Sequence, residues 1–179
     1  MTENQLLRAR RTIMLATSTL TLLTAAGCGG DGVLAPGLGS ANVTATGAVT
    51  ASGSGLAMFQ SVSSGGTTLF QIVIAPATIG NNTWSIQIAN YSGRLPTGTY
   101  TLTGLSGAQT NPTANFYYTN GSSAQQFNST SGQLVITTST ASAVAGNFTF
   151  SATDPVSGTA TVSAHGTFTA QCAPGMTCQ

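Results

Sequence analysis

The sequence predicts an all-β protein: an antiparallel β-sandwich, with a β-barrel as the alternative, after an N-terminal signal helix and a glycine-rich tether. From residue 41 onward, short runs rich in Val, Ile, Thr, Phe and Tyr alternate with turn-forming Gly, Asn, Ser and Pro. No convincing helical period of about 3.6 residues appears there. We favour the sandwich because residues 69–74 are apolar on both faces, as a central strand of a sandwich would be.

Residues 1–27 have the organisation of a signal peptide. Three arginines, at positions 8, 10 and 11, precede an apolar run over residues 12–26. Fifteen residues are too few to cross a bilayer, which takes about 20, but they suit the apolar region of a signal peptide, which has about 7–15. The segment therefore indicates export from the cytoplasm.

The segment Ala25-Ala26-Gly27-Cys28 resembles the lipobox of bacterial lipoprotein precursors, with Ala25 where Leu is commonest. The resemblance implies cleavage after Gly27 and acyl chains, such as palmitate, on Cys28. Two or more chains hold a protein stably at a membrane, whereas one chain holds it only marginally. Gly29 in place of Asp implies the outer membrane where the cell has one. An ordinary secretory signal and an uncleaved anchor are the alternatives.

Residues 28–40 form the lipidated cysteine and a tether. Five glycines and one proline within residues 29–40 oppose both helix and sheet. A flexible tether of this length lifts a domain by roughly 20 Å. The β domain is expected over residues 41–171, followed by a tail over residues 172–179.

Eight or nine short strands are expected. In order, they are 42–52 with a possible bulge at Gly47, 56–62, 67–75, 83–89, the end of 95–102, 116–119, 133–138, 144–153 and 158–170. Residues 63–66 (Ser-Ser-Gly-Gly) predict a hairpin turn. Trp84 shares its phase with Ile86 and Ile88, so we expect it in the core. The last three runs look like a meander.

A looser resemblance covers about half of the chain that remains after cleavage. Residues 96–100, 131–137, 144–152 and 162–168 look like the C-terminal half of certain uncharacterised β-rich bacterial lipoproteins. The resemblance implies architecture and location only, and no functional residue carries over from it.

The remaining cysteines form a candidate pair. Cys172 and Cys178 are separated by five residues with Pro-Gly in the middle. A disulfide closing a small C-terminal loop fits an exported protein. Two free thiols are the alternative, and a Cys-x5-Cys spacing with no nearby His is a poor metal site.

Charge is scarce, at 4% of residues, and lysine is absent. After the signal peptide only Arg94 is cationic, which excludes nucleic acid as a partner and leaves no lysine for a phosphate-binding loop. We expect no cofactor and no metal. Asp154 precedes Pro155 in a predicted turn, and His165 lies on the polar face of its strand, so we expect no enzyme.

A ligand surface is the remaining candidate. Tyr91, Arg94 and Tyr117 are the residues we select for it; the alternative is two partly buried tyrosines and a solvated arginine. The predicted function is that of a membrane-anchored lipoprotein of the bacterial envelope with a non-catalytic structural or interaction role. An envelope protein or a glycan would be its partner, and a carbohydrate-binding surface module is the alternative.

Overall fold

The computed structural model describes residues 38–64, 66–78, 80, 82–104, 110–121, 123–176 and 178. The chain is divided at residues 35 and 36, and every described residue belongs to the second unit, Pro36–Gln179. The predicted signal peptide, Cys28 and most of the predicted tether lie outside the described residues. Within the described ranges, no helix has the length and apolar character needed to cross a membrane.

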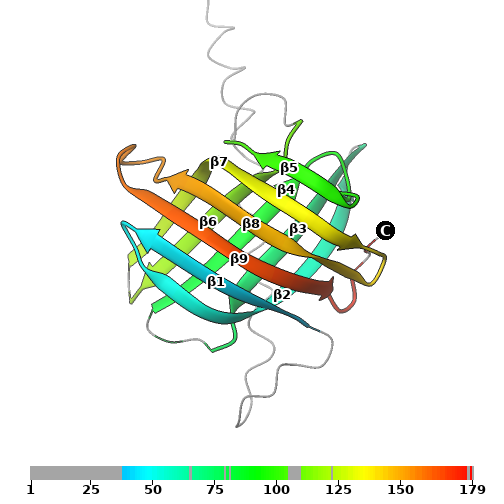
Figure 1. The fold of residues 1–179 in the computed structure, drawn as a ribbon, viewed down its shortest axis with the longest axis horizontal. Coiled ribbons are helices and arrows are strands. Elements are labelled where there is room, and N and C mark those ends of the chain that lie inside the picture. The colour runs from blue at the N-terminus through cyan, green and yellow to red at the C-terminus, as the bar shows by residue number, and fades with distance from the viewer. Residues whose placement is uncertain are drawn as a thin grey trace, which may run out of the picture. The chain divides into compact units, whose positions relative to one another are not determined.

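The second unit is a β-barrel rather than a sandwich (Figure 1). Its sheet has the order β5-β7-β6-β4-β3-β2-β1-β9-β8, and β7 also pairs with β8, so that eight strands close on themselves. The described residues form nine strands and no helix: β1 (Gly39–Gly47), β2 (Ala51–Ser64), β3 (Thr67–Pro76), β4 (Asn82–Asn90), β5 (Gly98–Leu102), β6 (Thr113–Asn120), β7 (Ser123–Ser139), β8 (Ala143–Thr153) and β9 (Thr161–Cys172). The all-β class is confirmed, the sandwich is wrong, and the barrel named as its alternative is right.

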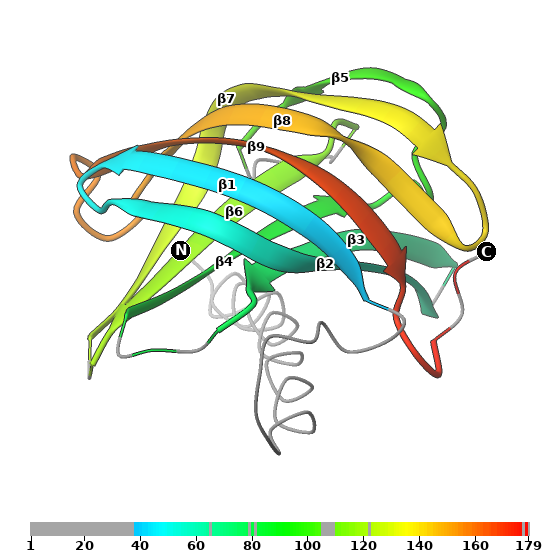
Figure 2. The same cartoon turned by 60° about the horizontal axis from the view of Figure 1, so that its bottom comes forward.

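Glycines in the middle of strands allow this closure. A Cβ atom on Gly132, Gly146 or Gly166 would collide with a carbonyl oxygen of the neighbouring strand, so only glycine fits at these three positions. Two register shifts between β7 and β8 add local bending. Figure 2 shows the result: β8, β9 and β1 form one curved wall, and β4 and β6 cross behind it. A flat two-sheet sandwich needs no such close approach.

Side chains fill the barrel. An eight-stranded barrel has an interior just wide enough to be packed by side chains, and six phenylalanines are fully buried here: Phe59, Phe70, Phe116, Phe127, Phe148 and Phe150. The predicted burial of Trp84 is confirmed, since the side chain is 7% exposed. Because successive side chains of a strand point to opposite faces, every second side chain points outward.

Along one edge, the strand β7 pairs with two different strands. Residues Ser123–Asn128 pair with β6, and residues Gly132–Ile136 pair with β5. Because β5 and β6 both run antiparallel to β7, they lie end to end, with residues 103–112 between them. The buried Ser129 hydroxyl closes the gap: it donates to the carbonyl oxygen of Thr103 at 2.6 Å and accepts from the amide of Ala114 at 3.0 Å.

Most predicted strands correspond to observed ones, and the C-terminal meander is confirmed by the β7–β8 and β8–β9 pairings. The expected strand over 42–52 is wrong in its bounds, because β1 ends at Gly47 and β2 begins at Ala51. The strand expected at 133 begins already at Ser123. The first half of β7 is polar, and Phe127 is the only large apolar side chain in that half. The apolar–polar alternation that predicts a strand is therefore absent there.

Candidate functional site

The outer surface of the barrel differs from one side to the other. The outward side chains of β1, β8 and β9 are almost all Thr, Ser, Asn or His and are mostly exposed. The outward side chains of β3, β4 and β6 include tyrosine, valine and several amides, and are mostly half-buried or buried. The outward side chains of this second side are therefore the more buried, and this side contains most of the candidate ligand surface.

Three amides lie side by side there. Gln87 on β4 pairs with Asn115 on β6, which pairs with Asn128 on β7, so the three side chains form a row across the strands. Tyr117 lies two residues beyond Asn115 on the same outward face, and Tyr91 follows the end of β4. We call Gln87, Asn115, Asn128, Tyr117 and Tyr91 the amide–tyrosine face.

Hydrogen bonds fix part of this face. The Tyr117 hydroxyl donates to Oε1 of Gln87 at 3.2 Å, which orients the ring along the amide row. Nε2 of Gln126 donates to Oδ1 of Asn128 at 2.7 Å. Asn115 is only 7% exposed, and its Oδ1 accepts no hydrogen bond from any described residue. Buried polar atoms are nearly always paired, so this buried oxygen is an exception on the amide–tyrosine face.

The two tyrosines of the face are close enough to influence each other. Burial raises the pKa of Tyr117 above its usual 10, and the negative charge that Tyr91 would acquire on ionisation raises this pKa further. A charge acts in this way only over a short distance. Tyr91 and Tyr117, two of the three residues predicted for a ligand surface, are therefore near enough to interact electrostatically.

The third predicted residue, Arg94, has another neighbour. Its Nη1 donates to the carbonyl oxygen of Cys178 at 3.2 Å. Cys178 is joined to Cys172 by a disulfide with a Cα–Cα distance of 5.9 Å, which is the pairing favoured from the sequence. The amide of Ala173 donates to the carbonyl oxygen of Phe59 at 2.9 Å. Arg94 thus helps to hold the C-terminal tail against one end of the barrel.

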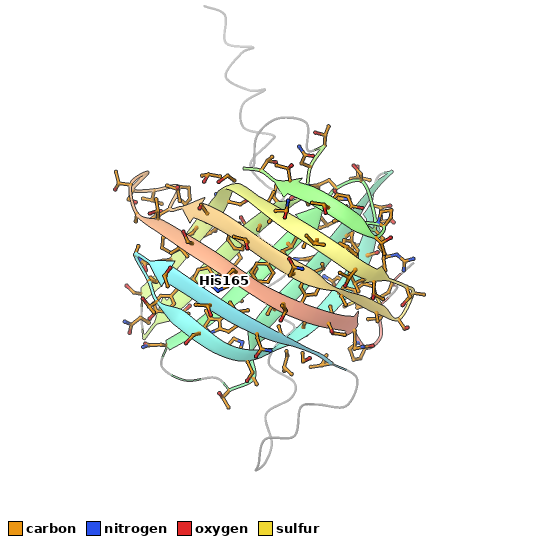
Figure 3. The ribbon with its side chains drawn as sticks, in the orientation of Figure 1. His165 is labelled. Carbon is orange, nitrogen blue, oxygen red and sulfur yellow. A yellow bond between two sulfur atoms is a disulfide. The ribbon has the colours of Figure 1, made fainter. Side chains whose placement is uncertain are left out.

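His165 lies on the other side of the barrel. It points outward from β9, as expected from the alternation (Figure 3). It borders a shallow groove of about 650 Å³ whose outward lining is hydroxyl and amide: Asn42, Thr44, Ser52, Ser54, Asn147, Thr149 and Thr167. No acidic residue lines this groove. The described ranges contain no group of three His, Cys, Asp or Glu residues that could hold a metal.

Asp154 lies in the turn between β8 and β9. Its Oδ1 accepts a hydrogen bond from the amide of Val156 at 2.7 Å, and its carbonyl oxygen accepts one from the amide of Gly158 at 2.8 Å. The carboxylate thus stabilises the turn that the Asp-Pro sequence predicts.

The amides of the face were missed in the sequence. Gln87 has a signal, because it alternates with the buried Ile86 and Ile88, but the row exists only through the register of three strands that are far apart in the chain. Comparison of the chain with protein-family models, with curated proteins and with solved structures finds no match to it.

Proposed function

We propose that the chain is a lipid-anchored protein of the bacterial envelope with a non-catalytic binding role. The observation that carries the proposal is the segment Ala25-Ala26-Gly27-Cys28 at the end of an apolar run that follows three arginines. In a lipoprotein precursor, the apolar run would insert into the membrane, cleavage would follow Gly27, and Cys28 would carry the acyl chains.

The surroundings of the ionisable side chains support a non-catalytic role. General acid–base catalysis needs a titratable group within hydrogen-bond reach of its partner. Asp154 accepts hydrogen bonds from the amides of its own turn, and His165 projects from the middle of β9 among hydroxyl and amide groups. Among the described residues, no hydrogen bond links either side chain to a side-chain hydroxyl group that could act as a nucleophile.

Mass spectrometry of the mature protein from a bacterial host tests the anchor. We expect a mature N-terminus at Cys28 that carries acyl chains, and the protein in the membrane fraction. The Cys28→Ser variant should leave that fraction. Cys178→Ser is the matched cysteine control and should remain there. An unmodified N-terminus, or one at another residue, would contradict the proposal.

Carbohydrate binding is the second candidate, and the amide–tyrosine face favours it. Amide side chains both donate and accept hydrogen bonds, as sugar hydroxyl groups do. Tyrosine adds a flat apolar ring with a polar tip. The half-buried Gln87 and Asn128, beside two tyrosines, offer both kinds of contact on one surface.

A glycan array tests this second candidate. We expect binding by the parent protein that is lost in Tyr91→Ala and Tyr117→Ala and retained in His165→Ala, which changes the opposite side of the barrel. Thermal unfolding of each variant separates lost binding from lost folding. Silence of the folded parent across a broad array would exclude the candidate.

A further inference from the structure

We propose that one end of the barrel, the end that carries the β2–β3 hairpin with Val62, contacts the headgroups of the membrane in which Cys28 is anchored. The inference rests on the proposed lipid anchor and adds to it an orientation and a contact surface. Its partner is the lipid surface itself.

Strand register defines this end of the barrel. Gly39, the first residue of β1, pairs with Ala57, and β9 ends at Cys172 opposite Phe59. From Gln60 to Ser64, β2 pairs only with β3 among the described residues. The hairpin therefore extends beyond β1 and β9, at the end where the chain leaves β1 toward Cys28.

Chain length limits how far this end can lie from the bilayer. Eleven residue steps separate Cys28 from Gly39, and a polypeptide spans at most about 3.3–3.6 Å per residue. Gly39 therefore lies within about 40 Å of the anchored cysteine, whatever the conformation between them. The opposite end of the barrel lies up to a further 12-residue strand away, as for β9, which is about 40 Å along the strand.

The side chains at the two ends also differ. Three large hydrophobic side chains are exposed among the described residues, and two of them lie at the hairpin end: Val62 at 45% and Tyr91 at 38%. The amide of Gly93, in the same loop as Tyr91, donates to the carbonyl oxygen of Thr68 in the hairpin at 3.0 Å. Tyrosine and aliphatic side chains without acidic neighbours suit the headgroup region of a bilayer.

The third exposed side chain provides a matched control. Val156 is 94% exposed, and it lies in the β8–β9 turn at the opposite end. The sole acidic side chain of the described ranges, Asp154, lies in the same turn. If the hairpin end contacts the membrane, a probe at residue 62 meets lipid and a probe at residue 156 does not.

Fluorescence quenching tests the orientation. The acylated full-length mature protein and its variants Val62→Trp and Val156→Trp are placed in phosphatidylcholine vesicles with or without headgroup spin-labelled phosphatidylcholine. The buried Trp84 is common to all three proteins and gives the baseline. We expect the spin label to cause at least a twofold greater fractional loss of emission in Val62→Trp than in the parent protein. The fractional loss in Val156→Trp should equal that of the parent.

The outcomes separate the orientation from the anchor. Equal quenching at both positions, stronger quenching at residue 156, or quenching at neither position in an acylated protein would overturn the orientation while leaving the anchor intact. Absence of acyl chains on Cys28, measured on the same sample by mass spectrometry, would overturn the proposed function instead. Both substitutions are at exposed positions, so folding of the variants is expected and is checked by thermal unfolding.

Discussion

The Ser129 side chain makes hydrogen bonds to the backbone where β7 passes from β5 to β6. Where β5 stops and β6 begins, its hydroxyl accepts from one main-chain amide and donates to one main-chain carbonyl. An apolar residue at this position would remove both of these hydrogen bonds, and each buried group left unpaired costs about 1–3 kcal/mol.

Removing this hydroxyl should therefore be costly. Ser129→Ala is expected to lower the free energy of unfolding by about 2–3 kcal/mol, measured by urea denaturation. Ser131→Ala changes an exposed serine two residues further along β7 and should stay within about 0.5 kcal/mol of the parent. Equal effects of the two substitutions would show that Ser129 does not bridge the strands.

Tyr117 makes the free energy of unfolding depend on pH in the alkaline range. The folded protein retains the Tyr117 proton above pH 10 because burial raises its pKa, whereas the unfolded chain loses it near 10. Between these two pKa values the unfolded state binds fewer protons, so the free energy of unfolding falls as pH rises; below pH 9 the effect is absent. Tyr117→Phe should lose less stability between pH 9 and pH 11, measured by urea unfolding at each pH.

A second titration tests the proximity of the two tyrosines. Because the charge on Tyr91 also raises the pKa of Tyr117, Tyr91→Phe should move the late phase of the absorbance titration to lower pH. At pH 7, Tyr117→Phe is expected to cost about 1 kcal/mol through the hydrogen bond to Gln87. An unchanged late phase in Tyr91→Phe would place the two phenols out of range of each other.

Among the elements, the strands were predictable and their closure was not. Alternation of apolar and polar residues predicts β4, β8 and β9, because one face of each strand packs in the core, and a run that is apolar on both faces predicts β3. Whether the outermost strands of a sheet meet depends on how sharply the strands bend. The sequence carries this information only in mid-strand glycines, which resemble ordinary turn or bulge signals until the neighbouring strand is known.

Gly166 offers a direct test of closure. A Cβ there would collide with the Asn42 carbonyl oxygen and would also press on the buried ring of Phe148. Gly166→Ala should lower the free energy of unfolding by about 3 kcal/mol or more. In the control Gly80→Ala, the one atom of the described residues within 4 Å of the added Cβ would be the Asn82 carbonyl oxygen, at 3.9 Å, so stability should change by less than about 0.5 kcal/mol. Thermal and urea unfolding measure both variants.

The candidate site was predictable only in part, for a similar reason. Tyr91 and Tyr117 stand out in the sequence as aromatics outside the core pattern, and the contribution of Tyr91 to the raised pKa of Tyr117 indicates that they are near each other. Arg94 was assigned to the same surface because it is near Tyr91 in sequence. Its observed partner, Cys178, is 84 positions away, so no local pattern could reveal that contact.

For the molecule as a whole, the scarcity of charge determines how stability responds to salt. The described residues include one Arg, one Asp and one His. Salt acts on charged pairs by screening, and few charges are present to be screened. Raising NaCl from 0.05 to 0.5 M should change the free energy of unfolding by less than about 0.5 kcal/mol, measured by urea denaturation at constant pH. A larger change would indicate an ionic interaction beyond the described contacts.

The position of β1 between β2 and β9 decides when the barrel can form. Ser40 pairs with Thr169, so the ring is completed only when the last strand reaches the first. Folding that depends on contacts this distant in sequence is slow, on the order of milliseconds to seconds. Until then the inner face and the edges of β1 and β8 have no partner, a condition that exposes a chain to aggregation. A chain exported N-terminus first, as proposed above, would thus cross the membrane unclosed and complete its barrel only after its C-terminal residues have emerged.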